Sequence, residues 1–292
     1  MSTVNSQTIV VLGATGLQGG AVTRHLLSDG WRVRAVTRNP KSEKARALSA
    51  LGTQVVQADM AERASLVPVF EGAYGVFNVQ NPIISGVEGE IRQGKNVADV
   101  ANQVGIRHLV YGSAGTGARG TGIPSWESKL VIEDYMKSLG LPLTILRPMA
   151  FMELMTAKKF FPAVSTWHVM PALMGSATKV VWLSVEDLGA IVAKAFAEPE
   201  HFIGKELNLT SDVQSIDESR AIYRERFGKN PSRFPMPVLM FERFGFIGKD
   251  LSIMWRWLRT NPIDTDTSST LAIRPNALSV RTWLENQKSA RA

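Results

Sequence analysis

Short apolar, β-branched runs alternate with longer segments of helical periodicity through the first half of the chain. The short runs predict strands at residues 8–12, 32–37, 54–57, 75–79, 108–112 and 143–146. The periodic segments predict helices at residues 17–28, 42–50, 61–70, 87–104 and 125–138. This alternation is typical of an α/β fold with a doubly wound parallel sheet, in which ligands bind at the carboxyl ends of the strands.

The pattern changes after Pro148 to a Met- and aromatic-rich stretch and then further strands and helices. These elements are predicted as strands at residues 179–183 and 206–209 and a helix at residues 185–197, with more helices after them. We expect residues 1–150 to form a nucleotide-binding domain, with residues 177–200 returning to it, and residues 151–292 to form a smaller mixed α/β lobe. The apolar residues within 238–258 are interpreted as the core of that lobe, with a lid or a partner groove as the alternative.

Composition narrows the class of protein. The 292 residues are 45% hydrophobic, which is enough for a substantial core, and they include no cysteine. Disulfides, thiol catalysis and thiolate zinc sites are therefore excluded. Since no apolar run reaches the roughly 18 residues of a membrane span and the first residues lack signal-peptide features, we expect a cytoplasmic protein without a membrane partner.

The formal net charge of +7 comes from 33 Lys and Arg against 26 Asp and Glu. These basic residues are spread along the chain, without a stripe interleaved with aromatics and without a helix-turn-helix or zinc motif. The four histidines show no metal-ligand spacing. We expect local phosphate recognition, no metal site and no direct contact with nucleic acid.

A glycine-rich segment follows the first predicted strand and opens the first predicted helix. Its residues are Gly13, Ala14, Thr15, Gly16, Leu17, Gln18 and Gly19. In this context Gly13 permits a tight turn, Gly16 lets the backbone approach a pyrophosphate, and Gly19 allows close helix–strand packing. The helix N-terminus faces the negative charge of the ligand. The segment predicts a Rossmann-type dinucleotide site, and its GxxGxxG spacing resembles that of the short-chain dehydrogenase/reductase superfamily.

The end of the second predicted strand favours NADP(H) over NAD(H). An NAD site places a carboxylate there for the ribose 2′-OH, but here the strand and the following turn carry no acid. Arg38 is predicted to contact a 2′-phosphate, because its guanidinium fork suits phosphate oxygens. Lys41 and Lys44 are weaker candidates, explained equally well as solvated charges. Asp59, with Met60 beside it, follows the third strand where the adenine edge would lie, and an exposed loop aspartate is the alternative.

The catalytic pattern of a short-chain reductase is incomplete in this chain. Ser113 and Lys129 occupy the serine and lysine positions and are the candidate catalytic residues. The tyrosine position, four residues before the lysine, is Ser125, whose hydroxyl is far too weak an acid to replace a phenol. None of the four tyrosines has helical spacing from Lys129. Interconversion of alcohol and carbonyl by the usual mechanism is thus disfavoured. Glu133, on the same helix, is expected in a surface ion pair.

Further motifs extend along nearly the whole chain. They lie at residues 13–20 (GATGLQGG), 36–40 (VTRNP), 92–95 (RQGK), 146–148 (LRP), 151–153 (FME), 183–189 (LSVEDLG), 277–279 (ALS) and 283–284 (WL). With these motifs the chain resembles the NmrA-like family, an atypical branch of the short-chain dehydrogenase/reductases, and within it the human-type NADPH-sensor members. The resemblance implies a Rossmann domain with a smaller C-terminal lobe. Members include NADP(H)-binding regulators that respond to redox state, NADPH-dependent quinone reductases, and reductases of phenylpropanoid-type double bonds.

The resemblance also implies roles for individual residues. Gly13 to Gly19 and Arg38 hold the phosphates, Asn78, Val79 and Gln80 flank the middle of the cofactor, Lys129 reaches the nicotinamide ribose, and Met149, Ala150 and Phe151 line the nicotinamide. Sensor members also lack the tyrosine, so the resemblance leaves regulator and reductase both open.

Two functions follow from this reasoning. A redox-sensing regulator that binds NADP(H) without turnover is narrowly preferred, because the catalytic tyrosine is missing. An NADPH-dependent reductase of quinones or conjugated enones is the alternative, because the apolar stretch 151–174 could cover the nicotinamide and accept a small aromatic substrate. The expected partners are NADP(H) with either such a substrate or a protein, and the Met- and Trp-rich lobe could provide a homodimer surface.

Overall fold

The computed structural model describes residues 7–156, 165–231 and 236–287. The chain divides into two compact units. The first unit comprises residues 1–117, 125–147 and 188–207, and the second comprises residues 118–124, 148–187 and 208–292. In the described residues no helix is long and apolar enough to cross a membrane.

A seven-stranded sheet organises the first unit, with the order β3-β2-β1-β4-β5-β6-β9. The strands are β1 (Thr8–Val11), β2 (Arg32–Thr37), β3 (Gln54–Gln57), β4 (Gly75–Asn78), β5 (His108–Gly112), β6 (Leu143–Pro148) and β9 (Glu206–Leu209). The pairs from β3 to β6 are all parallel, and Val10 of β1 aligns with Arg34 of β2 and Val76 of β4. Strand order reverses at β1 and β4, which is the switch point of a doubly wound sheet. The predicted fold class is confirmed.

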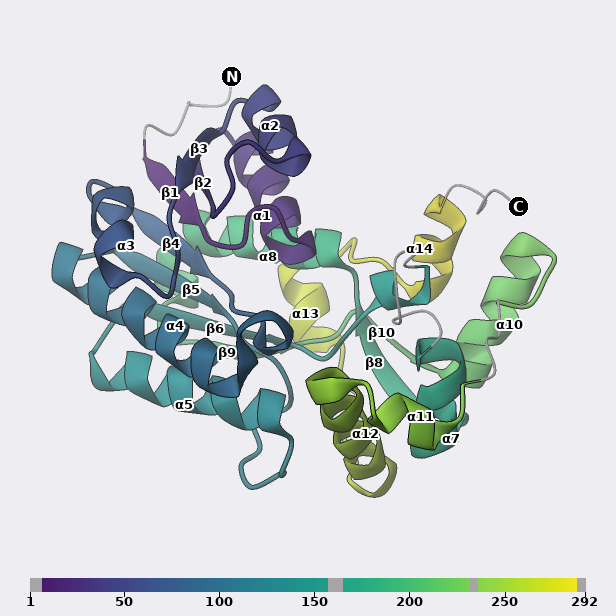
Figure 1. Cartoon of the computed structure of the whole chain (residues 1–292). Coiled ribbons are helices and arrows are strands. Elements are labelled where there is room, and N and C mark those ends of the chain that lie inside the picture. Colours follow the sequence, from purple (N-terminus) through teal and green to yellow (C-terminus); the bar gives the residue numbers. More distant parts are fainter. Residues whose placement is uncertain (1–6, 157–164, 232–235, 288–292) are drawn as a thin grey trace. The chain divides into compact units, whose positions relative to one another are not determined.

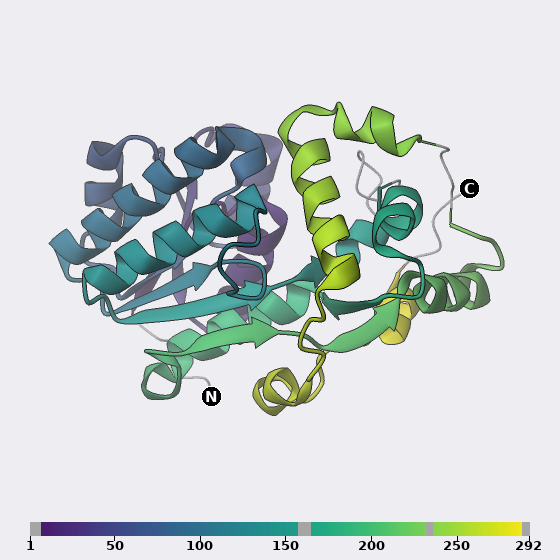
Figure 2. The same ribbon diagram turned by 90° about the horizontal axis from the view of Figure 1, so that it is seen from below.

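Helices cover both faces of this sheet, as Figures 1 and 2 show. They are α1 (Leu17–Ser28), α2 (Glu43–Ala50), α3 (Arg63–Phe70), α4 (Pro82–Val104), α5 (Pro124–Ser138), α8 (Val185–Ala197) and the short α9 (Pro199–Phe202). Buried side chains of α3, α4 and α5 form one core with β1, β4, β5 and β6. On the opposite face α1 and α8 pack so closely that a Cβ on Gly189 would lie 2.8 Å from the Ala21 backbone.

Four helices begin at residues other than those predicted, and α5 does so by a single residue, at Pro124. The Ser42 hydroxyl accepts the Ala45 N–H, so α2 starts after Ser42 and not at it. The Asp59 carboxylate accepts the Ala61 N–H in a separate turn, and α3 starts later, at Arg63. Helix α4 gains an initial turn at Pro82 and is interrupted at Gly86, where φ is 72°.

The second unit contains a three-stranded sheet with the order β10-β8-β7. Strand β8 (Lys179–Leu183) pairs antiparallel with β10 (Asp212–Ser215) and parallel with β7 (Ala150–Phe151). The helical segments are η1 (Met152–Met155), η2 (Ser165–Val169), α7 (Met170–Met174), α10 (Ile216–Phe227), α11 (Val238–Glu242), α12 (Gly245–Thr260), α13 (Ser268–Ile273) and α14 (Val280–Asn286).

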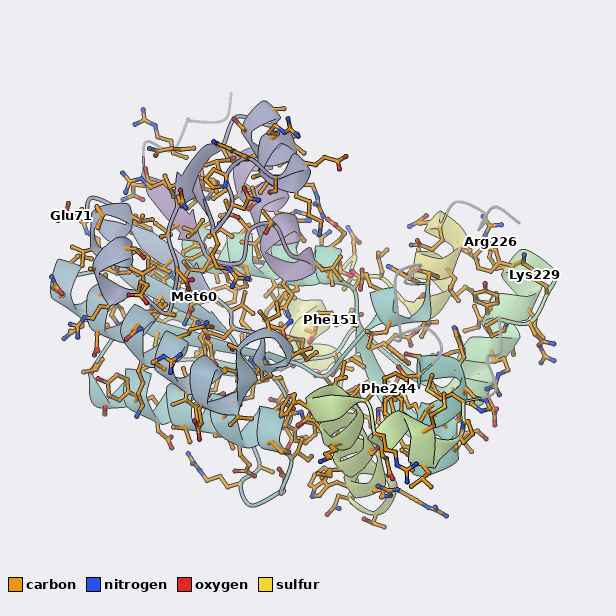
Figure 3. All side chains as sticks on the ribbon, in the orientation of Figure 1. Met60, Glu71, Phe151, Arg226, Lys229 and Phe244 are labelled. Carbon is orange, nitrogen blue, oxygen red and sulfur yellow. The ribbon has the colours of Figure 1, made fainter. Side chains whose placement is uncertain are left out.

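The apolar segment 238–258 contributes to the core of this unit and to its surface. Phe241 stacks on Trp255 with ring centroids 5.5 Å apart, and both are buried. Leu239, Met240 and Phe244 are exposed, and Figure 3 labels Phe244. Its interpretation as the core of the lobe therefore accounts for only part of the segment.

Candidate functional site

The loop between β1 and α1 turns sharply through its glycines. Gly13 has φ of 64°, in the left-handed region that favours glycine, and its carbonyl accepts the Gly16 N–H at 2.8 Å. Gly16 is extended and exposed, and among the described residues no side chain caps α1. The N–H groups of the first turn of α1 are therefore available to a ligand.

Gly19 allows α1 to approach the loop closely. A Cβ at Gly19 would lie 2.4 Å from the carbonyl oxygen of Gly13 and 2.6 Å from its carbonyl carbon. Both atoms belong to the backbone, so a larger residue would displace the loop. At Gly20 the nearest such atom is 3.5 Å away, which is ordinary contact.

Hydrogen bonds within the turn after β2 hold its conformation, and its cationic side chains are exposed to solvent. The Thr37 hydroxyl accepts the Asn39 N–H, and the Asn39 side chain accepts the Lys41 N–H. Arg38 is exposed, and its guanidinium has no partner among the described residues. Lys41 is exposed in the same way, whereas Lys44, in the first turn of α2, donates to the Thr15 carbonyl at 3.3 Å and so joins α2 to the glycine loop.

Asp59 and Met60 follow β3 in a loop fixed from two sides. The Asp59 carboxylate caps its own turn, and Asn96 of α4 donates to the carbonyls of Met60 and Ala61 at 3.0 and 3.1 Å. The Met60 sulfur accepts a weak hydrogen bond from the Gln80 amide at 3.6 Å; Figure 3 labels Met60. The loop after β3 therefore reaches the end of β4.

The end of β4 meets the glycine loop. A Cβ on Gly13 would lie 3.3 Å from Val79 Cγ1, and a Cβ on Gly112 would lie 3.5 Å from Gln18 Oε1. The Gln80 amide donates to Asn78 Oδ1, and both side chains are buried. The structure thus gathers the predicted residues of β1, β3 and β4 at one edge of the sheet.

Three buried polar atoms at this edge of the sheet indicate which kind of ligand fits there. Gln18 Oε1, Asn78 Nδ2 and Gln80 Oε1 have no hydrogen-bond partner among the described residues. A buried amide without a partner is costly, so these groups are suited to a ligand that both donates and accepts hydrogen bonds. The ribose hydroxyls and carboxamide of a nicotinamide dinucleotide have that character, and the glycine loop beside them suits its pyrophosphate.

Lys129 of α5 is buried and paired. Its ammonium donates to Glu90 Oε1 of α4 at 2.8 Å, while the Ser128 hydroxyl donates to Glu90 Oε2 at 2.5 Å. Sequence reasoning missed Glu90. The signal was present, because Glu90 shares the buried face of α4 with Gly94, Val97 and Ala101 at helical spacing.

Tyr111 is a phenol close to Lys129, since the ammonium lies 5.9 Å from its ring centroid. Burial raises the pKa of Tyr111 well above 10, and the negative charges of Glu90 and Glu133 raise it further. A phenol with a raised pKa holds its proton at neutral pH. Tyr111 therefore does not substitute for the tyrosine absent from position 125.

Ser113 lies in a second buried ion network. Its hydroxyl donates to Glu133 Oε1 at 2.6 Å, and Arg147 donates to both oxygens of the same carboxylate. Arg147 also pairs with Glu206 at 2.6 Å. Burial opposes the charge of Arg147, but the bonds to Glu133 and Glu206 outweigh it and raise the pKa of Arg147. The expectation of a surface pair for Glu133 was wrong, because its carboxylate is the centre of this buried network.

Met149, Ala150 and Phe151 belong to the second unit, where Ala150 and Phe151 form β7. All three are partly exposed (Figure 3 labels Phe151). The half-buried Glu153 follows them, and its carboxylate accepts the Val185 N–H at the start of α8. Burial raises the pKa of Glu153. In the described residues no group of three or more His, Asp or Glu could hold a metal ion.

The fold places this chain among the α/β proteins with a doubly wound, Rossmann-like sheet. The sequence profile of the NmrA-like family matches residues 5–283, and the chain belongs to that family. The NmrA-like family domain-containing oxidoreductase FrzB of Cladobotryum sp. is 30% identical over 90% of this chain and 89% of its own length. The corresponding oxidoreductase lnaB of Aspergillus flavus is 30% identical over 85% of this chain and 82% of its own.

Solved structures share the fold at lower identity. The structure of Nmra, a negative transcriptional regulator, superposes with a TM-score of 0.80 and 20% identity over 97% of this chain and 95% of that one. Nmra has also been solved in complex with NAD and with NADP. The triphenylmethane reductase of Citrobacter sp., solved with NADP(H), gives a TM-score of 0.77 and 20% identity over 96% of this chain and 99% of that one.

Proposed function

We propose that this NmrA-like protein binds NADP(H) at the carboxyl edge of the first unit's sheet. The observation that carries the proposal is the exposed guanidinium of Arg38 just after β2, which has no partner in the part of the chain that the structure describes and lies on a strand end without a carboxylate. A 2′-phosphate would satisfy that cation, whereas a 2′-OH would not need it. Complexes of Nmra with both NAD and NADP mean that cofactor choice must be tested for this chain.

The proposed activity is NADPH-dependent reduction of a conjugated, electron-poor acceptor such as a quinone or an enone. The sequence alone narrowly favoured a regulator. The relatives at 30% identity are oxidoreductases by name, and for this reason we prefer the reductase. NADPH would supply the hydride. The chain's residues would bind and orient it, and no step would require a phenol acid, which agrees with Ser125 in the tyrosine position.

The absence of a tyrosine as proton donor limits the kind of acceptor that the proposed reaction can reduce. A quinone or enone delocalises the negative charge that a hydride brings, so solvent can deliver the proton afterwards. An isolated ketone develops a localised alkoxide and needs a proton donor during transfer. We therefore expect turnover with conjugated acceptors and none with simple ketones.

A redox-responsive regulator is the second candidate. It is favoured by the internal pairing of Lys129 with Glu90 and of Ser113 with Glu133, which leaves neither candidate catalytic side chain unpartnered. Such a protein would bind NADPH and NADP⁺ with different consequences for a protein partner and would turn over neither.

The deciding experiment titrates purified protein with NADPH and with NADH and then follows NADPH absorbance against quinones, enones and simple ketones. We expect tighter binding of NADPH and absorbance decay with the conjugated acceptors only. Binding without decay would favour the regulator. Equal or tighter binding of NADH would refute the assignment to Arg38.

A further inference from the structure

The buried ion pair between α4 and α5 is the observation that extends the proposed function. The side chain of Glu90 is 0% exposed and that of Lys129 is 8% exposed. The two helices run side by side over one face of the sheet in both views (Figures 1 and 2). Because the pair joins neighbouring elements, α4 controls where the ammonium on α5 lies.

Both oxygens of Glu90 are used. Oε1 accepts from the Lys129 ammonium at 2.8 Å, and Oε2 accepts from the Ser128 hydroxyl at 2.5 Å. Ser128 and Lys129 are consecutive residues of α5, so the carboxylate is held against the helix by two bonds. Glu90 is therefore fixed in one orientation and cannot simply rotate away from the lysine.

The ammonium retains unused bonding capacity. A lysine ammonium has three N–H donors, and Glu90 is the partner of one of them. Glu90 is its only polar partner among the described residues, and the ring of Tyr111 is 5.9 Å away. Two donors remain for hydroxyl oxygens, which is the number needed to hold a ribose diol.

We propose that Glu90 is a positioning residue of the NADP(H) site, which orients Lys129 so that the two remaining donors of its ammonium bind the nicotinamide ribose. The inference rests on the proposed function, because it assigns Glu90 a role only when a dinucleotide is bound. A buried ammonium needs a counter-charge, and Glu90 supplies it without occupying all of the donors.

The test measures NADPH affinity through its fluorescence in Glu90→Gln, Lys129→Met and the double variant. Glu90→Gln keeps the shape of the side chain and removes its charge. We expect it to raise the Kd for NADPH about tenfold, the size expected for loss of a charge-assisted hydrogen bond. In the Lys129→Met background the same change should alter the Kd by less than about twofold, since Glu90 acts through the lysine.

Two further variants keep the test decisive if Glu90→Gln folds poorly. Ser128→Ala removes only the hydroxyl that orients Glu90, keeps both charges, and should weaken NADPH binding in the same direction by about threefold. Glu206→Gln removes a carboxylate paired with Lys137 and Arg147 at the edge strand, and should leave the Kd unchanged.

The outcomes separate this inference from the proposed function. If the wild-type chain binds NADPH, and Glu90→Gln and Ser128→Ala lower thermal stability with the Kd unchanged, the pair is purely structural and the inference is wrong. An effect of Glu90→Gln that persists in the Lys129→Met background also overturns it. If the wild-type chain binds no NADPH, the proposed function itself fails, and Glu90 has no cofactor to serve.

Discussion

The glycine loop with the β2–α2 turn and the buried ion pairs of α5 both belong to the first unit, but they satisfy their polar groups in opposite ways. The loops are held by local hydrogen bonds, including those of the Thr37 and Asn39 side chains. Among the described residues, the N-terminus of α1 has no side-chain cap and the Arg38 guanidinium has no partner. The buried ion pairs link Glu90 of α4 with Lys129 of α5, and Glu133 of α5 with Arg147 of β6. Polar groups without a protein partner are suited to ligand binding. Polar groups that are paired inside the core contribute mainly to stability or to the positioning of neighbouring side chains.

Substitution of Arg147 should have the largest effect if the second buried network is chiefly structural. Arg147→Leu leaves Glu133 buried without its counter-charge, and we expect the free energy of unfolding to fall by about 3–5 kcal/mol in urea denaturation. The control is Arg63→Gln, which breaks an exposed pair with Asp99 and should cost less than about 1 kcal/mol. Similar losses in the two variants would contradict the contrast between buried and exposed pairs.

His108 extends the contrast to a buried neutral group. Its Nε2 bonds the Thr144 hydroxyl at 2.8 Å, and burial lowers the pKa of His108 to about 4 from an ordinary 6.5. Because the folded pKa is depressed, the unfolded chain binds the proton first. Stability should be complete above about pH 6.5 and fall by about 3 kcal/mol as the pH drops to about 4.

The measurement is the free energy of unfolding between pH 4 and 7 in wild type, His108→Gln and His201→Gln. His108→Gln should flatten the slope over that window. His201 is exposed, so its substitution is the control and should leave the slope as in wild type. An unaltered slope in His108→Gln would show that other groups cause the acid sensitivity.

Gly19→Ala tests the loop side of the comparison through backbone packing. A Cβ there meets the Gly13 backbone at 2.4 Å, so the loop must shift, and we expect NADPH affinity to fall at least about a hundredfold in a fluorescence titration. Gly20→Ala is the matched control on the same helix, with ordinary contacts at 3.5 Å. It should bind NADPH normally and gain up to about 1 kcal/mol of stability. Equal affinity in both variants would mean that the loop tolerates displacement.

Arg38→Ser should have the smallest of these effects, and the effect should be selective for NADPH over NADH. We expect the Kd for NADPH to rise about tenfold while the Kd for NADH changes less than about twofold, because only NADPH carries the 2′-phosphate. Unfolding stability should not change, since Arg38 is exposed and unpaired among the described residues. Lys41→Ser, in the same turn, should weaken NADPH binding less. An equal loss of affinity for NADPH and NADH would show that Arg38 does not bind the 2′-phosphate.

Much of the fold could be predicted because its signals are local. Strand and helix periodicity located the elements from Thr8 to Leu146, and the glycine spacing located the turn before α1. Errors occurred where a side chain caps a helix, as Ser42 does for α2, or where Pro82 begins an extra turn of α4. Those differences depend on single hydrogen bonds, which periodicity does not record.

The sequence by itself determined the doubly wound sheet, the glycine loop and the acid-free end of β2, because each depends on residues that are neighbours along the chain. Only the tertiary structure decided that Glu90 pairs with Lys129 across 39 positions and that Glu133 is buried rather than exposed. A charged residue on a helix has the same local pattern whether it faces water or a partner. What it faces is set by the packing of α4 and α5 on the sheet, and that packing also sets what the charge can do.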